Sequence, residues 1–432
     1  MPGMSGGRLE RAAFRFAPGL AGLIAFAGMA LFHAHGDRAL YAAILEGWGI
    51  LPYAYPFLDI ESILKAIDCR GQGVDVWAPN ACMGGGWYSY GPLLVRASVF
   101  GLDAGDRLAL GFLIAIGFFL ALSALPPCRS WAEVAVLSAA SVFAVERANL
   151  DAALFILTVC GVHLVLLPGG FRWAGYGAFV FAALLKFYPA VLMILAARER
   201  WRTLAVTGAA AVAGLAALLA FAGGDVATSL RVSPYGSPYT DLFGARNLPL
   251  GLIALPMAAP ETYDEVLRSP LPPPALAVYA LLAALAATVA CRSLRRDMAG
   301  WPALPDGHAA FLVAGAVVIA GCFFATQNIA YRAIFLLLTL PGLFALARAD
   351  GRYRLLIAGI VFLLWEEFFH HLVAGPAEIG FWLFREAVWW WAVARLASLL
   401  GAFLLSCPAG RAIRERWPAL DAAVTGGRAP RR

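Results

Sequence analysis

The chain has very little charge for its length. Only 14% of its 432 residues are Asp, Glu, Lys or Arg, whereas a soluble domain has about a quarter. Lysine is almost absent: only Lys65 and Lys186 occur, and every other permanently cationic side chain belongs to an arginine. Hydrophobic residues make up 61% of the chain, and its mean hydropathy is +0.75. This composition excludes a soluble globular protein and indicates an integral membrane protein.

Motifs for metal or nucleic-acid binding are also scarce. The chain has 6 histidines and 7 cysteines but no CxxC pair. The pairs Glu366–His370 and Glu367–His371 have a spacing that could hold a metal on a helix, but interfacial polar residues or intrahelical hydrogen bonds are the favoured interpretation. The sequence requires no cofactor, and a divalent metal has no support. The net charge of +6 comes from short arginine clusters between apolar runs, which is typical of cytoplasmic loops and predicts no nucleic-acid partner.

Apolar runs long enough to cross a bilayer recur along the whole chain. With the N-terminus in the cytoplasm, alternate threading places basic loops such as "RERWR" and "CRSLRRD" on one side. The sequence therefore predicts an all-α polytopic membrane protein, a single domain over 1–432 with a cytoplasmic tail at 407–432. The expected crossings, about ten in number, are 18–34, 107–125, 132–145, 150–168, 202–222, 273–291, 308–325, 331–348, 353–371 and 386–406.

One apolar run contains a lysine and a proline in its middle, within "AALLKFYPAVLMILAARERWR". Pro189 removes a backbone donor and disfavours helix for the residue before it. The run between Arg172 and Arg198 is too short for two full crossings. We therefore expect a re-entrant pair of half-helices meeting near Lys186, with a single bent span as the alternative. A buried, unpaired ammonium is costly, so Lys186 should meet an anion.

Two long segments, 35–106 and 223–272, are expected outside the membrane. In the first, apolar residues recur at helical spacing from Asp59 to Cys69, which predicts an amphipathic helix at the membrane surface. Asp59 would cap this helix or act as a catalytic acid or base, and the acids and Tyr90 in the same segment favour catalysis. Cys69 and Cys82 are the only cysteines in the predicted external segments. We expect them to form a disulfide, with two free thiols as the alternative.

Further polar residues gather at the predicted external ends of two spans. "ERANLDAALFIL" places Arg147, Asn149 and Asp151 at one helix entrance, and "TQNIAYR" places Arg332 against the positive-inside bias. Ordinary interfacial residues are the alternative. A carboxylate beside several cations suits a lipid-linked sugar phosphate, because the phosphate needs Lys or Arg and an acceptor hydroxyl needs a base. A transport path would distribute polar residues through the bilayer.

Three segments resemble the GT-C superfamily of membrane glycosyltransferases, and within it the bacterial family 87 polyprenol-phosphate mannosyltransferases. They are "DIESILKAIDCRGQGVDVW" with "YSYGPLLV", then "ERANLDAALFIL", then "AALLKFYPAVLMILAARERWR". The sequence departs from the family pattern at Ala148, where Gly is usual, and at Gly91, where Pro is common. The insert "CRGQGVDVWAPNACMGGG" is not a general family feature.

The resemblance implies an inverting transferase in the bacterial inner membrane, with its site facing the periplasm. The donor would be a polyprenyl phosphate carrying mannose or another hexose or pentose, and the acceptor a glycan or glycolipid. It implies Asp59 as the base and Lys186 and Arg147 as ligands of the donor phosphate. Topology alone adds Arg332, and the predicted set is completed by Tyr188, Asn149, Asp151 and Tyr90. The alternatives are a transporter or flippase of lipid-linked substrates and an oligosaccharide polymerase or ligase.

Overall fold

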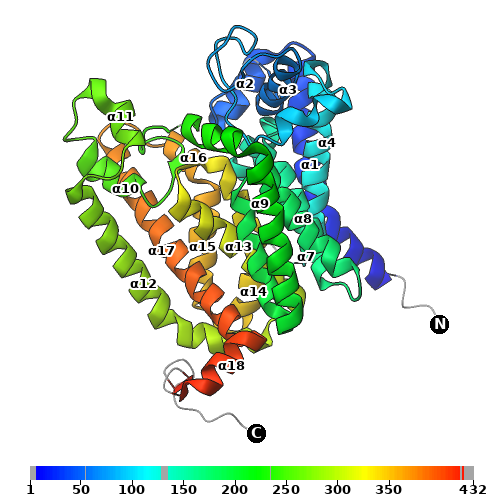
Figure 1. The fold of residues 1–432 in the computed structure, drawn as a ribbon, viewed down its shortest axis with the longest axis vertical. Helices are drawn as coiled ribbons and strands as arrows, with labels where there is room; N and C mark the ends of the chain where they lie inside the picture. The colour runs from blue at the N-terminus through cyan, green and yellow to red at the C-terminus, as the bar shows by residue number, and fades with distance from the viewer. Residues whose placement is uncertain (1–5, 54, 128–134, 234, 419–420, 423–432) are drawn as a thin grey trace.

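The computed structural model describes residues 6–53, 55–127, 135–233, 235–418 and 421–422, and this part of the chain is almost entirely helical (Figure 1). The α-helices are α1 (Gly6–Ala34), α2 (Arg38–Gly47), α3 (Leu58–Gly71), α4 (Arg107–Ala124), α6 (Ala139–Glu146), α7 (Leu150–Leu166), α8 (Phe171–Leu185), α9 (Trp201–Val232), α10 (Asn247–Pro249), α11 (Tyr263–Arg268), α12 (Pro273–Gly300), α13 (Asp306–Ala325), α14 (Leu340–Ala349), α15 (Tyr353–Leu364), α16 (Glu366–His371), α17 (Ala377–Ser406) and α18 (Pro408–Arg416).

Tighter and wider helical turns connect these elements. The 3₁₀ segments are η1 (Leu94–Phe100), η2 (Ala104–Asp106), η3 (Tyr188–Arg198), η5 (Pro260–Thr262), η6 (Trp301–Ala303) and η7 (Ala330–Thr339), and η4 (Leu250–Ala254) is a π-helical turn. The strands β1 (Leu242–Phe243) and β2 (Asn328–Ile329) form a short antiparallel pair.

Seven helical segments of the described chain are long and apolar enough to cross a membrane. They lie at Ala17–Ala34, Ala104–Ala124, Trp201–Val232, Pro273–Ala303, Asp306–Ala325, Ala330–Ala349 and Ala377–Ser406. The pair α6 and α7 also passes this test but bends by 108° between its two helices. The all-α, multi-pass prediction is therefore confirmed in outline, while the count of ten crossings stays a prediction.

Burial separates central from peripheral helices. The η7–α14 segment and α13 are largely enclosed by protein, whereas α9 and α12 leave most of their apolar side chains on the outside. Outward apolar side chains are expected on helices that face lipid. The backbone of such a helix needs no partner in the lipid, because its hydrogen bonds are made within the helix. The core thus lies around α13 and η7, beside the segments that carry the predicted site.

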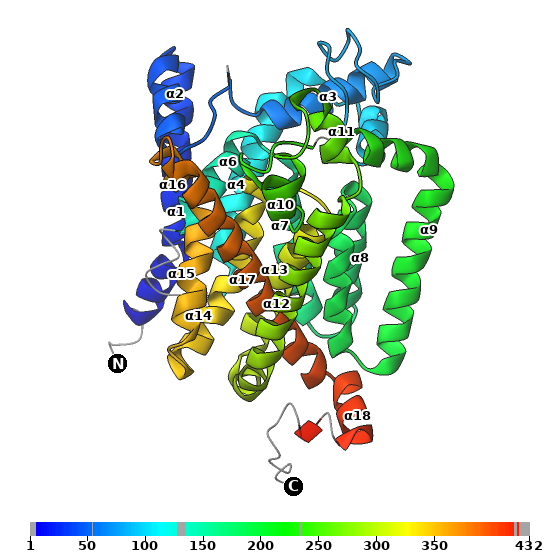
Figure 2. The ribbon, with the colours of Figure 1, turned by 90° about the vertical axis from the view of Figure 1, so that its left-hand side faces the viewer.

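The helices α2, α3, α11 and α16 gather at one end of the molecule, called here the α3 end, while α1 begins and α18 lies at the opposite end (Figures 1 and 2). Helix α3 confirms the helix predicted from Asp59 to Cys69. Its apolar positions Ile63, Leu64 and Ile67 are buried against neighbouring elements, as the spacing indicates. This packing holds the start of α3 at a fixed place over the membrane-spanning helices.

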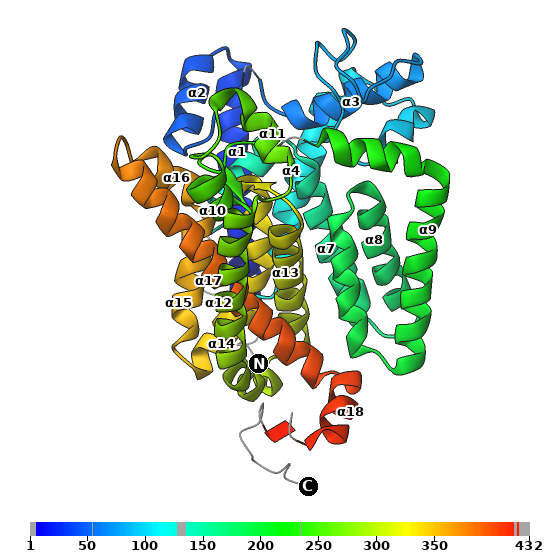
Figure 3. The ribbon, with the colours of Figure 1, turned by 60° about the vertical axis from the view of Figure 1, so that its left-hand side comes forward.

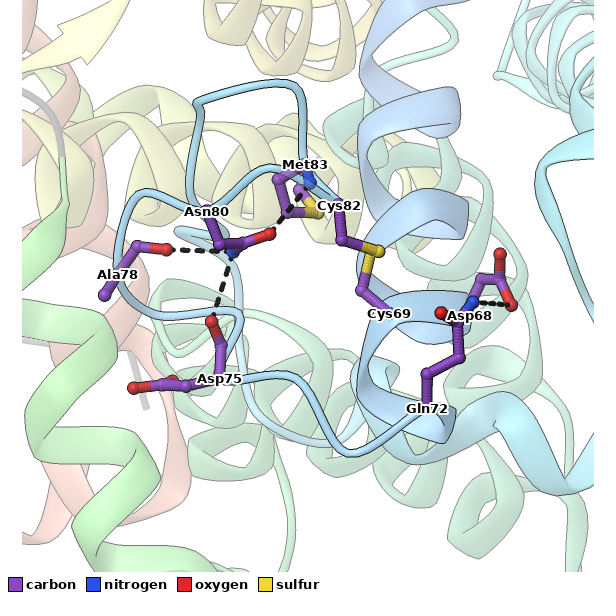
Figure 4. Close-up of a disulfide and its surroundings, with 8 residues drawn as sticks. All are labelled: Asp68, Cys69, Gln72, Asp75, Ala78, Asn80, Cys82 and Met83. Carbon is purple, nitrogen blue, oxygen red and sulfur yellow. Dashed lines mark hydrogen bonds between the residues drawn. A yellow bond between two sulfur atoms is a disulfide. The ribbon is translucent and has the colours of Figure 1, made fainter.

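A disulfide between Cys69 and Cys82 closes the loop that follows α3, which confirms the predicted pairing (Figure 4). Asn80 shapes this loop from within: its amide nitrogen donates to the carbonyl oxygens of Asp75 and Ala78, and its amide oxygen accepts from the backbone nitrogen of Met83. The free cysteines among the described residues are Cys160, Cys291, Cys322 and Cys407, and Cys128 lies outside the described residues.

Two predicted segments have internal structure that the sequence did not indicate. The predicted span 202–222 ends at the one non-helical residue of α9, Ala222, and α9 then continues as helix to Val232 within the predicted external segment 223–272. Figure 3 shows these last turns running across the top of the molecule, at a steep angle to the rest of α9. The predicted span 353–371 is divided at Trp365 into α15 and α16.

The predicted break near Lys186 and Pro189 is confirmed. Helix α8 ends at Leu185, Lys186 has extended backbone angles, and η3 begins at Tyr188 with Pro189 in its first turn. Proline suits the first turn of a helix because no backbone donor is needed there. Because Lys186 lies outside the helix, its side chain does not follow the direction that the next helical position of α8 would have.

Candidate functional site

Apart from Tyr90, which lies between α3 and η1, the members of the predicted catalytic and substrate-binding set come from four chain breaks that meet at the α3 end. These are the start of α3, the corner between α6 and α7, the junction of α8 with η3, and the junction of β2 with η7. Helix ends and breaks leave backbone groups and polar side chains free to point into a shared space. The convergence therefore depends on interrupted helices.

The corner between α6 and α7 carries Arg147, Ala148 and Asn149. Ala148 has a φ of 43°, in the left-handed region that favours glycine. Asn149 is the N-cap of α7, and its side-chain oxygen accepts from the backbone nitrogen of Asp151 at 2.8 Å. The tight turn thus sends the side chains of Arg147 and Asn149 toward the start of α3.

Asp59 is held directly by this corner. Its Oδ2 accepts from Asn149 Nδ2 at 2.5 Å, and its Oδ1 accepts from Arg147 Nη1 at 3.3 Å. The backbone nitrogen of Asp59 also donates to the carbonyl oxygen of Arg147 at 3.1 Å. The N-cap of α3 is Phe57. The alternative that Asp59 serves as a helix cap is therefore wrong, and its carboxylate is committed to the corner.

Burial of the Asp59 carboxyl raises its pKa above the ordinary value, and the charge of Arg147 and the hydrogen bond from Asn149 offset only part of this effect. The side chain keeps 16% of its surface exposed. Asp59 therefore combines a raised pKa with access from outside.

Asp151 anchors a second group of side chains. Its Oδ1 accepts from Lys186 Nζ at 2.6 Å and from the Tyr188 hydroxyl at 2.9 Å, and its Oδ2 accepts from Arg332 Nε at 2.9 Å. Asp151 is fully buried, so it contacts the protein on every side. The prediction that the buried Lys186 meets an anion is confirmed, and the anion in this structure is the Asp151 carboxylate.

The short β1–β2 pair positions Arg332 for its contact with Asp151. Its Nη1 donates to the side-chain oxygen of Asn328, while Asn328 Nδ2 donates to the carbonyl oxygens of Cys322 at 2.8 Å and Thr326 at 2.9 Å. The pairing of β2 with β1 fixes the backbone at Asn328. Sequence reasoning placed Arg332 correctly at a helix entrance, but its partner lies 181 residues away and could not be read from local spacing.

Aromatic rings cover the cations of the site. The Tyr90 ring lies 5.4 Å from Lys186 Nζ, and the Tyr188 ring lies 4.9 Å from the guanidinium carbon of Arg332. Tyr53 lies 3.7 Å from the guanidinium carbon of Arg147 and was missed in the sequence. Its signal was weak, because an aromatic residue in an irregular apolar segment has no spacing pattern. The rings add favourable cation–π contacts without adding charge.

All the residues predicted for the site lie together in this structure, apart from the two disulfide cysteines. We call this group the Asp59–Asp151 cluster, and its members are Asp59, Tyr90, Arg147, Asn149, Asp151, Lys186, Tyr188 and Arg332. It holds three cations and two carboxylates, and the buried Glu146 adds a third carboxylate 3.8 Å from Arg147 Nε. Lys186 keeps 17% of its side chain exposed, and Arg147 and Arg332 keep 11% each. The cluster can therefore attract an anion from outside.

A separate buried group at the same end contains Glu366, Glu367, Arg385 and Glu386. Arg385 donates to the carbonyl oxygens of Pro238, Thr240 and Leu242. These hydrogen bonds fix the segment that leads into β1. Glu366 accepts from Trp389 Nε1 at 2.8 Å, and burial raises its pKa well above the ordinary value. Among the described residues, no three His, Cys, Asp or Glu side chains are grouped to hold a metal.

No protein-family model matches the chain, and no curated protein or solved structure shows significant similarity to it. The chemistry of the Asp59–Asp151 cluster and the apolar helices around it are therefore the evidence for function.

Proposed function

We propose that this chain is a membrane glycosyltransferase of the GT-C type, similar to family 87. It would move mannose or another hexose or pentose from a polyprenyl-phosphate donor to a periplasmic or lipid-linked acceptor. The observation that carries the proposal is the meeting of a partly exposed carboxylate, Asp59, with three cations whose side chains also keep part of their surface exposed. A base beside an anion site is what transfer from a sugar phosphate to a hydroxyl requires.

Asp59 is the proposed general base. Its carboxylate takes the proton of the acceptor hydroxyl as the acceptor oxygen attacks the anomeric carbon of the sugar. The bond between that carbon and the phosphate oxygen breaks, and its electron pair leaves with the phosphate. A pKa raised by burial brings Asp59 closer to the working pH, where a base combines availability with driving force. Attack from the face opposite to the phosphate inverts the anomeric configuration.

Arg147, Lys186 and Arg332 are the proposed ligands of the donor phosphate. A phosphate leaves already charged, so cations can stabilise it without a carboxylic acid to protonate it. Asp151 is fully buried and bonded to Lys186 and Arg332, so it holds these two side chains in place instead of contacting the donor. The step as written needs no cofactor.

The finer topology belongs to the same proposal. We place about ten crossings and a re-entrant pair at α8 and η3 in a bacterial inner membrane. The α3 end would face the periplasm, and both termini would lie in the cytoplasm. The positive-inside rule supports this orientation, because the arginine-rich "RERWR" and "CRSLRRD" connections lie at the junctions before α9 and at the end of α12.

The test uses the full-length protein in lipid nanodiscs with synthetic polyprenyl phosphates carrying single sugars. We expect one of these donors to lose its sugar to an added glycan or glycolipid acceptor, with inverted anomeric configuration by NMR. A nucleotide sugar serves as the control and should give no product. Movement of intact lipid-linked sugar across vesicles, without cleavage of the sugar–phosphate bond, would instead establish the flippase alternative and overturn the proposal.

A further inference from the structure

The bend in α9 falls where a membrane would end. The part of the helix before Ala222 has about 21 residues, which is roughly 31 Å at 1.5 Å per residue. The hydrocarbon core of a bilayer is about 30 Å thick. Ala222 then breaks the helix with a φ of −140° and a ψ of 26°. The helix therefore changes direction at the point where its length equals the thickness of the hydrocarbon core.

The residues after the bend, 223–232, are called here the α9 arm, and their two faces differ. Val226 and Ser229 point inward and are buried. The outward positions are Gly224, Ala227, Leu230 and Arg231, and Leu230 keeps 57% of its surface exposed. An interfacial helix combines apolar side chains that enter the lipid boundary with basic side chains among the headgroups.

The first long segment fastens the α9 arm at its two ends. Arg96 pairs with Asp225 at 3.2 Å and covers the Phe221 ring at 4.2 Å, and Trp87 Nε1 donates to the carbonyl oxygen of Val232 at 2.9 Å. Trp87 belongs to the segment that directly follows the Cys69–Cys82 disulfide. Tryptophan and arginine are favoured at membrane interfaces, because each combines an apolar body with a polar group.

The same arm is packed against the neighbours of Lys186. Leu218, Ala222 and Val226 form a small apolar cluster with Leu184 and Phe187. The Ser229 hydroxyl also donates to the carbonyl oxygen of Tyr90 at 2.8 Å. Tyr90 is the residue whose ring lies over Lys186. The depth of the α9 bend in the membrane therefore fixes the depth of Lys186.

We propose that the α9 arm lies flat in the headgroup layer of the membrane and holds Lys186 at the depth of the lipid phosphates. The partner of this surface is the bilayer itself, with Leu230 toward the acyl boundary and Arg96 and Arg231 among the headgroups. The inference rests on the spanning length of α9 and on the packing of its bend. It does not depend on the proposed glycosyl transfer.

Site-directed spin labelling of the full chain in nanodiscs tests the depth. Leu230→Cys carries the nitroxide, in a background with Cys128, Cys160 and Cys291 replaced by Ala. Val212→Cys, exposed near the middle of the part of α9 before the bend, is the hydrocarbon control, and Gln72→Cys at the end of α3 is the aqueous control. We expect the ratio of oxygen to nickel-chelate accessibility at Leu230 to fall between those of the two controls.

Three outcomes would overturn the proposal. Leu230 could match the aqueous control, match the hydrocarbon control, or be shielded from both reagents by protein, such as a second copy of the chain. Ala227→Cys, one turn earlier on the same outward face, gives a second reading if the Leu230 variant does not fold. Neither position belongs to the Asp59–Asp151 cluster, so failure of the proposed enzyme activity leaves this measurement unaffected.

Discussion

The Asp59–Asp151 cluster and a second ion cluster contain similar residue types but differ in how far their carboxylates and cations are exposed. The second, called here the Asp297 cluster, joins α12, α15 and α17 away from the α3 end. Asp297 is fully buried and accepts from Arg395 at 3.1 and 3.3 Å, from the Tyr353 hydroxyl at 2.6 Å and from the Ser398 hydroxyl. One carboxylate faces one guanidinium, and the remaining acceptor capacity is used by neutral donors.

The difference lies in the number of ions and in the exposure of the carboxylate and the lysine. In the Asp297 cluster a fully buried carboxylate pairs with one guanidinium and holds three helices together. In the Asp59–Asp151 cluster three cations lie beside Asp59, Asp151 and the neighbouring Glu146, and Asp59 and Lys186 remain partly exposed. A closed ion pair in a membrane protein thus has a structural role, while a cluster with an exposed carboxylate and an exposed cation can bind a ligand. The following predictions test this division, from the largest expected effect to the smallest.

The largest effect is expected for Asp59→Asn. Loss of the general base should lower the transfer rate by about 10²–10⁴-fold, because positioned proton transfer contributes that much. The amide keeps the size of the side chain, so the thermal midpoint should change little. The measurement is single-turnover transfer by the purified protein.

The matched control for this variant is Asp68→Asn on the same helix, where the exposed carboxylate accepts from the neighbouring Gln72 side chain. It should transfer at the wild-type rate. If Asp59→Asn also transferred at that rate, the open cluster would lose its catalytic role and the comparison would fail.

Asp297→Ala should lower the free energy of unfolding by about 3–5 kcal/mol, because it leaves the buried Arg395 without its anion. Transfer per folded molecule should stay unchanged. Thermal unfolding, together with activity normalised to folded protein, measures both. Asp306→Ala removes an exposed partner of Arg198 and should cost about 0–1 kcal/mol. A loss of activity without loss of stability at Asp297 would contradict its structural role.

Lys186→Gln should weaken donor binding by about 10–100-fold, since a hydrogen bond to a charged group contributes roughly 1.5–3 kcal/mol. The other lysine provides the control. Lys65 is 43% exposed and pairs with Glu61, so Lys65→Gln should leave donor affinity unchanged. The dissociation constant of a non-hydrolysable polyprenyl phosphate analogue, measured by equilibrium binding, is the readout. Equal affinities for the two variants would remove Lys186 from the anion site.

The smallest effect is a pH dependence assigned to Asp59. Its raised pKa means that the transfer rate should fall as pH drops through a value above about 3.9, the ordinary pKa of Asp. Stability should respond in the opposite direction. The folded state binds the Asp59 proton more tightly than the unfolded chain, so this contribution is present at low pH and is lost as pH rises through the raised pKa.

Rate profiles and thermal midpoints over the same pH range separate these two effects. In Asp59→Asn the stability change assigned to this group should disappear, because the amide does not titrate. An acid limb of the wild-type rate at or below the ordinary pKa of Asp would contradict a raised pKa in the active protein.

Local pattern was sufficient for the helices and for much of the site. The period of apolar residues located α3, and Pro189 located the break after α8. The polar residues of "ERANLDAALFIL" placed Arg147 and Asn149 at the start of α7. Local pattern failed where a contact depends on residues far apart in the chain. Asp297 reads as part of the basic connection "CRSLRRD", yet it is buried because Arg395, 98 residues away, provides its counter-ion.

By itself, the sequence determined that this chain lies in a membrane, that a helix breaks near Lys186 and which polar residues stand at several helix ends. These follow from hydrophobic content and backbone chemistry, which act over a few residues. Only the tertiary structure decided that Lys186 is neutralised by Asp151, that Asp59 binds the α6–α7 corner instead of capping α3, and that α9 bends at Ala222. Charge balance and depth in the membrane are properties of assembled helices, because they depend on which distant side chains share one buried space.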